Sequence, residues 1–166
     1  GTTMANTQSM CTSFMSELMY GYHQFGQPTL TSRGSLTAPT NDTFKAALYL
    51  ASATINASTT AYSATGEVSG TNYTAGGISV TNATTPSSTN ASATAGVAFW
   101  TPSASLTYTT VTLSTAFDTV LIYNNTQGNR AVSVHTFGSQ TITAGTFTLT
   151  MPSNTTSTAL LRFSTT

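Results

Sequence analysis

Side chains that could carry acid–base or metal chemistry are few in this chain and lie far apart. Only 5% of its 166 residues are charged, and four basic residues balance four acidic ones. A catalytic site needs several titratable groups that converge. No serine stands in a nucleophile-elbow pattern, and the acids and histidines available are Glu17, His23, Asp42, Glu67, Asp118 and His135. We therefore predict a protein that is not an enzyme and has no catalytic residue, cofactor or metal.

Two of the potentially reactive residues have simple structural interpretations. His135 lies in a strand-like run and points away from Val132 and Val134, so we expect it on the solvent or interface side of a sheet. No His or acid stands at metal-ligand spacing from it. Cys11 is the only cysteine, which excludes an intrachain disulfide and predicts a buried, inert thiol.

The positive charges do not form a groove for nucleic acid. The chain's cations, Arg33, Lys45, Arg130 and Arg162, are scattered, whereas nucleic-acid binding needs clustered Lys and Arg. Nucleic acid is therefore not an expected partner. Lys45 leaves two alternatives open: it protects an edge strand, or it forms an isopeptide crosslink with an Asn or Asp if a carboxylate such as that of Glu67 or Asp118 lies beside it.

Composition indicates one folded domain that is free to associate with other subunits. Disordered Ser/Thr-rich stalks lack aromatic and branched apolar residues, but 10% of this chain is aromatic. No apolar run approaches the ~20 residues of a membrane-spanning helix, so a membrane is not an expected partner. A net charge of zero lowers the repulsion between copies, which favours a homo-oligomer.

A single helix is predicted near the N-terminus, over residues 6–22. Met10, Phe14, Leu18 and Tyr22 recur every four residues and form an apolar stripe. Asn6 or Thr7 is suited to cap the start of this helix, and Gly21 is suited to end it. The stripe must be buried against the chain's own sheets or against a neighbouring subunit. We take as candidate protein-interface residues Met10, Phe14, Leu18, Tyr22, Phe25 and the sole tryptophan, Trp100.

The rest of the chain predicts an antiparallel β-sandwich, Ig-like or jelly-roll-like. Residues 24–41 contain Gly and Pro that break regular structure, so we expect residues 1–41 to be a helix and an extended arm and residues 42–166 to be the β-sandwich domain. Residues 82–96 are low in complexity and are expected to form a loop. Gly138-Ser139, Ala144-Gly145 and Pro152 onward are expected turns. The expected strands are 43–50, 77–81, 97–100, 106–113, 119–123, 131–137, 140–143, 146–151 and 159–163, with a bulge near Val111.

Residues 44–80 join two of these strands through a Gly-rich loop. We expect Gly76 and Gly77 to turn the backbone sharply into the next strand, and Glu67 to hold the loop closed by accepting hydrogen bonds from loop amides. Together with Gly70, these residues are predicted to have a structural role. The alternative is a catalytic role, which would need an acid–base partner, and none stands near Glu67 in the sequence.

The same loop carries a resemblance to a known group of proteins. Residues 44–49 (FKAALY), 66–70 (GEVSG) and 73–77 (YTAGG) resemble a block found in small virion structural proteins of tailed bacteriophages. Residues 4–11 (MANTQSMC), 116–118 (AFD), 121–125 (LIYNN) and 130–132 (RAV) extend the likeness, which covers most of the chain from Met4 to Met151. The resemblance implies a virion protein without indicating which part of the virion it occupies.

Three functions are consistent with the resemblance and the composition. The leading hypothesis is a head decoration (cement) protein that binds and stabilises the capsid shell, with the major capsid protein or other virion subunits as partners and the virion head as its location. The second is a tail or fibre module that binds a host-surface glycan, which would need an exposed aromatic cluster. The third is an extracellular filament or adhesin subunit.

Overall fold

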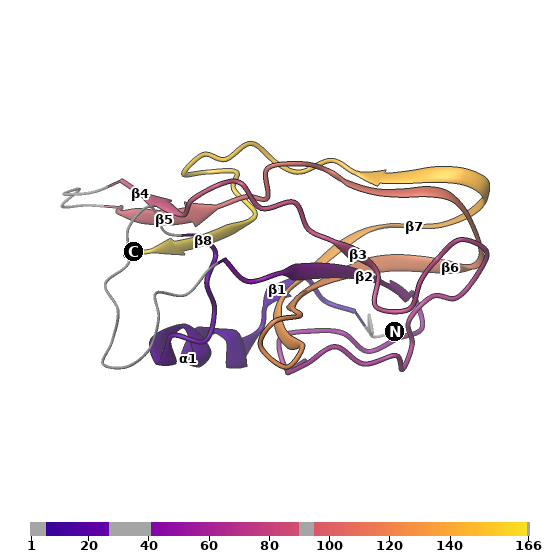
Figure 1. Ribbon diagram of the computed structural model, residues 1–166, viewed down its shortest axis with the longest axis horizontal. Helices are drawn as coiled ribbons and strands as arrows, with labels where there is room; N and C mark the ends of the chain where they lie inside the picture. The colour runs from indigo at the N-terminus through magenta and orange to yellow at the C-terminus, as the bar shows by residue number, and fades with distance from the viewer. Residues whose placement is uncertain (1–5, 27–40, 90–94, 166) are drawn as a thin grey trace, which may run out of the picture.

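The computed structural model describes residues 6–26, 41–89 and 95–165 and has the mainly β, sandwich-like architecture that was predicted (Figure 1). Its two antiparallel sheets have the strand orders β1-β7-β6-β2-β3 and β4-β5-β8. One helix lies near the N-terminus. The elements are β1 (Ser9–Met10), α1 (Thr12–Tyr20), β2 (Phe44–Leu50), β3 (Ile78–Ser79), β4 (Ser87–Ser88), β5 (Val97–Trp100), β6 (Leu106–Asn124), β7 (Arg130–Leu149) and β8 (Leu161–Ser164).

One long, bent hairpin builds most of the sandwich. Strands β6 and β7 stay paired from Asn124 opposite Arg130, next to the turn, to Leu106 opposite Leu149 at the far end. In Figure 1 the hairpin runs along the lower layer, curves at the right-hand end and returns along the top. Register shifts interrupt the pairing between Tyr108 and Phe117, and such bulges bend strands. The same two strands therefore contribute to both layers.

The strand β2 is buried on both faces between these layers. Phe44, Ala46, Ala47, Leu48 and Tyr49 are all fully buried. One face is covered by the returning part of the hairpin, from which the Tyr108 hydroxyl donates to the Ala46 carbonyl at 2.7 Å. A strand covered on both faces reads as a continuous apolar run, which explains the sequence of β2.

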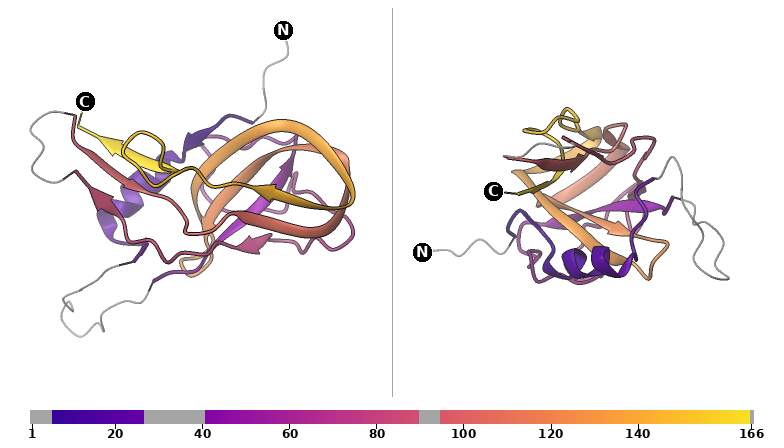
Figure 2. Two further views of the ribbon diagram at one scale, coloured as in Figure 1. Left: turned by 90° about the horizontal axis from the view of Figure 1, so that it is seen from above. Right: turned by 90° about the vertical axis from the view of Figure 1, so that its left-hand side faces the viewer.

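The helix packs against β7 and shares the core of the strands (Figure 2). Seen end-on in the right-hand view, α1 lies below the strands of the larger sheet and β4, β5 and β8 lie above them. Phe14 is fully buried and belongs to the same hydrophobic cluster as Phe44 and Trp100. The helix therefore covers one side of the sandwich and is part of its core.

The predicted start of the helix was wrong. The helix begins at Thr12 with Cys11 at the N-cap position, so neither Asn6 nor Thr7 caps it. Residues 9–10 pair with β7 as the short strand β1. The side chain of Asn6 instead donates to the Leu50 carbonyl at 3.0 Å and accepts from the Ile55 amide at 2.9 Å. Tertiary hydrogen bonds therefore override a local capping preference.

Two predicted hairpin turns were also wrong. Gly138-Ser139 and Ala144-Gly145 lie inside the continuous strand β7. They fall where the pairing with β6 shifts register and the strand bends. The true turn joins β6 to β7 at residues 125–129, where Gly128 and Asn129 have φ of 63° and 60°. The bulge near Val111 is confirmed. The expected loop at residues 82–96 contains the strand β4, which pairs with β5, and residues 27–40 of the expected arm lie outside the described residues.

His135 is partly exposed, which agrees with the expected solvent or interface side, and residues 152–162 cover part of this face of β7. Its ring lines the space between β7 and residues 152–162, and its Nε2 lies 2.8 Å from the Ser133 hydroxyl. Burial lowers the pKa of this imidazole from 6.5 to about 4. The alternation of side chains along a strand shows which face of β7 a residue occupies. It does not show whether another segment of the chain covers that face.

The lowered pKa of His135 predicts a pH-dependent stability. Because the unfolded chain binds more protons on this group between pH 6.5 and pH 4, stability is fully present above pH 6.5 and falls as the pH is lowered towards 4. The contribution is on the order of 3 kcal/mol at most. Urea unfolding of the wild type and of His135→Gln across this range measures it. We expect a shallower pH dependence in the variant, and equal slopes would contradict the assignment.

Candidate interaction surface

The helix α1 ends in a motif that turns the chain back over the core. The amide of Tyr22 donates to the Glu17 carbonyl and the amide of Gly21 donates to the Leu18 carbonyl, both at 3.0 Å. Gly21 has a φ of 81°. This pair of bonds is the Schellman motif, in which a left-handed residue satisfies the last carbonyls of a helix. The prediction that Gly21 ends the helix is confirmed.

A buried acid on the helix anchors it to the β6–β7 turn. Glu17 is only 6% exposed. One of its oxygens accepts from Nε2 of His23 at 2.9 Å, and the other pairs with the Arg130 guanidinium at 3.0 Å. The Arg130 guanidinium also lies 4.7 Å from the ring centroid of Tyr22. Glu17 therefore links the helix, the segment after it and the start of β7.

Asn124 fixes the proton arrangement in this network. Its Oδ1 accepts from the amides of Thr126 and Gln127, both at 3.1 Å. Its Nδ2 must then point the other way, where it donates to His23 Nδ1 at 2.9 Å and to Asp42 Oδ2 at 2.8 Å. Because His23 Nδ1 accepts, Nε2 carries the proton that is donated to Glu17. An acid, a histidine and an amide thus meet here, but every group is buried and paired internally, which is the pattern of a structural network.

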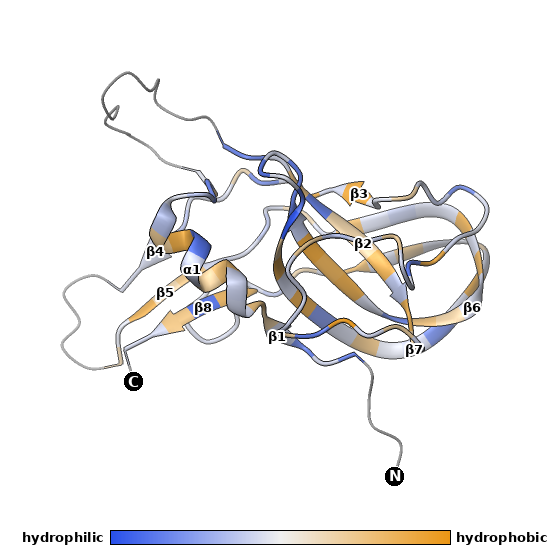
Figure 3. Cartoon of the chain, turned by 90° about the horizontal axis from the view of Figure 1, so that it is seen from below, coloured by the Kyte–Doolittle hydropathy of each residue, from blue (hydrophilic) through white to orange (hydrophobic). Residues whose placement is uncertain are grey.

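The exposed large apolar side chains gather around this anchored helix. Among the described residues they are Met15, Met19, Tyr20, Tyr22 and Phe163, with exposed fractions from 38% to 85%. The Tyr20 and Tyr22 rings stack with centroids 5.5 Å apart. We call Met15, Met19, Tyr20 and Tyr22 the helix surface. Figure 3, which shows the molecule from the helix side, places α1 in front, next to β5 and β8.

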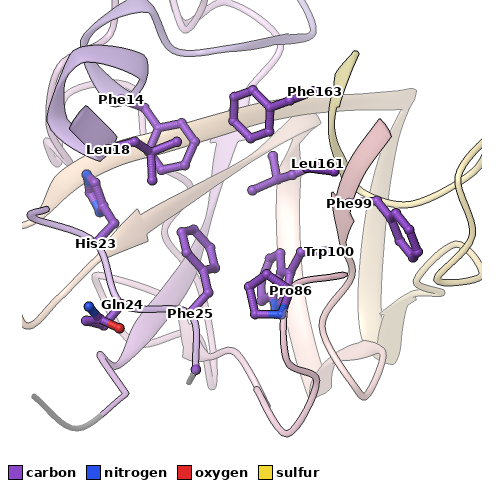
Figure 4. A pocket seen from close by; sticks show the side chains of 12 residues that line it. Phe14, Leu18, His23, Gln24, Phe25, Pro86, Phe99, Trp100, Leu161 and Phe163 are labelled. Carbon is purple, nitrogen blue, oxygen red and sulfur yellow. The ribbon is translucent and has the colours of Figure 1, made fainter. Parts of the chain in front are cut away.

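An aromatic pocket of about 220 Å³ lies behind the helix surface (Figure 4). Figure 4 shows Phe14 and Leu18 from α1 facing Trp100 and Leu161 across it, with Phe25 between them. The Phe25 ring lies 4.4 Å from that of Phe44 and 4.7 Å from that of Trp100. The pocket therefore separates α1 from the smaller sheet and is lined almost entirely by apolar groups.

The six predicted interface residues occupy three different places. Phe14, Phe25 and Trp100 are buried and Leu18 is partly buried, and all four line the aromatic pocket. The Trp100 indole donates to the Asn82 side chain and the Thr84 carbonyl, both at 3.1 Å. Met10 lies in β1, and only Tyr22 belongs to the helix surface. Met19 lies beside the stripe in the sequence but was not chosen as an interface residue, although among the described residues it is the most exposed large apolar side chain; the periodicity of the stripe selects the inward face of the helix.

Glu67 accepts three hydrogen bonds within the loop of residues 61–77, one from a loop amide, as expected, and two from tyrosine hydroxyls that the sequence did not indicate. Its carboxylate accepts from the Tyr62 hydroxyl at 2.6 Å, from the Tyr73 hydroxyl at 2.7 Å and from the Gly76 amide at 2.8 Å. Burial, with Glu67 as a further cause, raises the pKa of Tyr62 and Tyr73 above the ordinary tyrosine range. These hydroxyls therefore stay protonated and act as donors.

Two glycines let this loop approach the sheets closely. Gly77 has a φ of 81°, and a Cβ there would lie 1.8 Å from the Ala46 carbonyl oxygen. A Cβ on Gly70 would lie 1.9 Å from the Thr112 carbonyl oxygen. Only glycine fits at either position. The expected structural roles of Gly70, Gly76 and Gly77 agree with this geometry, and the strand β3 begins directly after Gly77.

The remaining reactive residues show no catalytic or metal arrangement in the described part of the chain. Cys11 is fully buried, and burial raises the pKa of its thiol to about 12, with Glu17 as a smaller cause. Asp118 accepts from Asn6 at 2.8 Å and from Thr119 at 2.7 Å. Lys45 has no ion-pair partner among the described residues, which include all four acids, so the geometry offers no support for a Lys45 crosslink to an acid.

Among the described residues, no three His, Cys, Asp or Glu side chains lie close enough together to hold a metal ion. The helix found in that part of the chain is too short to cross a membrane. Comparison of the chain with known protein families, curated proteins and solved structures finds no match.

Removing the Glu67 carboxylate is expected to loosen the loop. In Glu67→Ala two hydroxyls and one amide lose their acceptor, and we expect a loss of about 2–4 kcal/mol in the free energy of unfolding. Glu67→Gln, which keeps one oxygen, should lose less. Denaturant unfolding measures both, with the exposed neighbour Thr65→Ala as the control. A Glu67→Ala protein as stable as Thr65→Ala would contradict the bracing role.

Reversing the donor character of Asn124 is expected to detach the helix. In Asn124→Asp a carboxylate faces the accepting nitrogen of His23 and the carboxylate of Asp42, so we expect a loss of about 3 kcal/mol or more. Hydrogen exchange should become faster in α1 before it does in β2. The exposed neighbour variant Asn125→Asp serves as the control. Unchanged exchange in α1 would show that the network does not anchor the helix.

Proposed function

We propose that this chain is a non-enzymatic virion structural protein, most specifically a head decoration protein that binds the capsid shell through the helix surface. The observation that carries the proposal is the concentration of exposed apolar side chains at Met15, Met19, Tyr20 and Tyr22. Contiguous exposed apolar side chains mark interaction sites. The resemblance of the loop around Glu67 to small phage virion proteins supports a virion as the assembly to which the partner belongs.

The chemistry of the helix surface suits protein binding. Aromatic residues, Met and Arg are enriched in protein interfaces, and Tyr and Arg often dominate their binding energy. Tyr22 and Arg130 lie together at its border, and the Arg130 side chain is 43% exposed. The four acids of the chain accept hydrogen bonds internally. Burying this surface against a partner therefore desolvates few charges.

A glycan-binding tail or fibre module is the second candidate. The observation that favours it is the stacked, solvent-facing pair Tyr20 and Tyr22, because aromatic rings provide apolar faces on which sugar rings can stack. A glycan site also needs polar groups that converge on the sugar hydroxyls. Arg130 lies beside Tyr22 and is one such group, but the other members of the helix surface, Met15 and Met19, supply none. Protein binding is therefore the preferred proposal.

Binding to shells tests both candidates. The purified protein is mixed with capsids of the virus that encodes it, and bound copies are counted by sedimentation and cryo-electron microscopy. We expect hundreds of copies per shell and at least about tenfold weaker binding for Met19→Glu. Ser139→Glu, which adds the same charge at the exposed bend of β7, should bind normally. No copies on the shell would refute the decoration role, and retention on host polysaccharide that is lost in Tyr20→Ala would favour the glycan module.

A further inference from the structure

A second region, away from the helix surface, has the properties of a small-molecule site. Two adjoining cavities of about 590 and 230 Å³ lie between β7 and the segment of residues 152–162, which runs in yellow along the top of Figure 1. They share Gln8, His135, Pro152 and Leu160. Both open to solvent, and together they fall within the range of some 300–1,000 Å³ that is usual for small-molecule pockets.

The lining of the larger cavity is partly polar and includes two donors without a partner among the described residues. His135 bonds Ser133 through Nε2, and its Nδ1 has no hydrogen-bond partner in the described part of the chain. The Arg162 side chain lines the same cavity and has neither an ion pair nor a hydrogen bond among the described residues. No Asp or Glu lines either cavity. A ligand that complements this lining therefore carries a negative charge.

The Ser133 hydroxyl lets His135 act as a donor without being charged. When the hydroxyl donates to Nε2, the neutral ring carries its proton on Nδ1. Burial lowers the pKa of His135 to about 4, so this neutral form prevails at neutral pH. Arg162 then supplies the positive charge and His135 a directed hydrogen bond. A carboxylate accepts hydrogen bonds from both of these groups.

The lining of the smaller cavity is mainly apolar. It is lined by side chains of both hairpin strands, among them Leu106, Ile122 and Leu149, and by Met151 and Leu160 of the covering segment. A partly polar cavity that shares lining residues with a mainly apolar one matches a molecule with a charged head and a hydrocarbon tail, because burial of the tail is favourable in proportion to its apolar area.

From this arrangement we infer that the cleft binds an amphipathic monocarboxylate, with the carboxylate at Arg162 and His135 and the aliphatic tail among Leu106, Leu149 and Leu160. This site is separate from the helix surface and does not depend on the proposed assembly role. It is absent from the sequence prediction because its residues come from three parts of the chain that share no motif.

Titration of the isolated protein with octanoate tests the inference. We expect one saturable site by calorimetry and amide NMR shifts centred on His135, Leu149 and Leu160. Octylammonium, which has the same tail and the opposite charge, should bind at least tenfold more weakly. Arg162→Gln should weaken octanoate binding roughly fivefold to tenfold, whereas Lys45→Gln, which removes a positive charge outside the cleft, should leave it unchanged.

Each alternative outcome overturns the inference. These outcomes are no saturable octanoate binding, equal binding of octylammonium, equal effects of Arg162→Gln and Lys45→Gln, and shifts centred on the aromatic pocket near Trp100. A second variant, Leu160→Trp, fills the junction of the two cavities and should abolish binding while the thermal unfolding midpoint confirms folding. Because Arg162 is exposed, Arg162→Gln tests the site even if Leu160→Trp fails to fold.

Discussion

The close approach of the loop of residues 61–77 to the buried strand β2 is the constraint on which the rest of the fold depends. β2 is covered on both faces, so polar groups around it must be paired within the protein. Tyrosine hydroxyls do this: Tyr73 accepts from the Leu48 amide at 3.0 Å, and Tyr108 donates to the Ala46 carbonyl at 2.7 Å. Tyr123 donates to the Gly76 carbonyl at 2.6 Å. Glu67 then gathers the loop, and Gly77 allows the contact.

The four acidic side chains of this sparsely charged chain all accept hydrogen bonds from groups within the protein. Glu67 organises the loop over β2, Asp118 receives the N-terminal segment through Asn6, and Glu17 and Asp42 flank the network around Asn124. Bonds to charged acceptors are stronger than neutral ones, so a few acids can fix several irregular segments. The outer surface consequently depends on Thr, Ser and Asn for its solubility.

Much of the fold could be predicted from the sequence, and the failures have clear causes. Val97–Trp100 and Phe44–Leu50 were located closely because strand length and burial are local signals. The bent hairpin was predicted as separate strands. Glycine is typical both of a turn between strands and of a bend within one strand, so Gly138 and Gly145 did not distinguish the two. Glu67 was found from its surrounding glycines. The network of Glu17, His23 and Asn124 was not predicted. Its members lie up to 113 positions from their partners in the sequence, and no sequence motif connects them.

The same network explains how a nine-residue helix can present a defined surface. Isolated helices shorter than about 12–15 residues are marginal in water, so α1 depends on its tertiary contacts. Phe14 fixes its inner face, and Glu17 fixes its end through Arg130 and His23. Arg130 in turn lies against Tyr22, so the ion pair that anchors the helix also orders one of its exposed rings. A surface ordered before it meets a partner loses less entropy on binding, which makes the buried acid of α1 as important to recognition as the exposed methionines beside it.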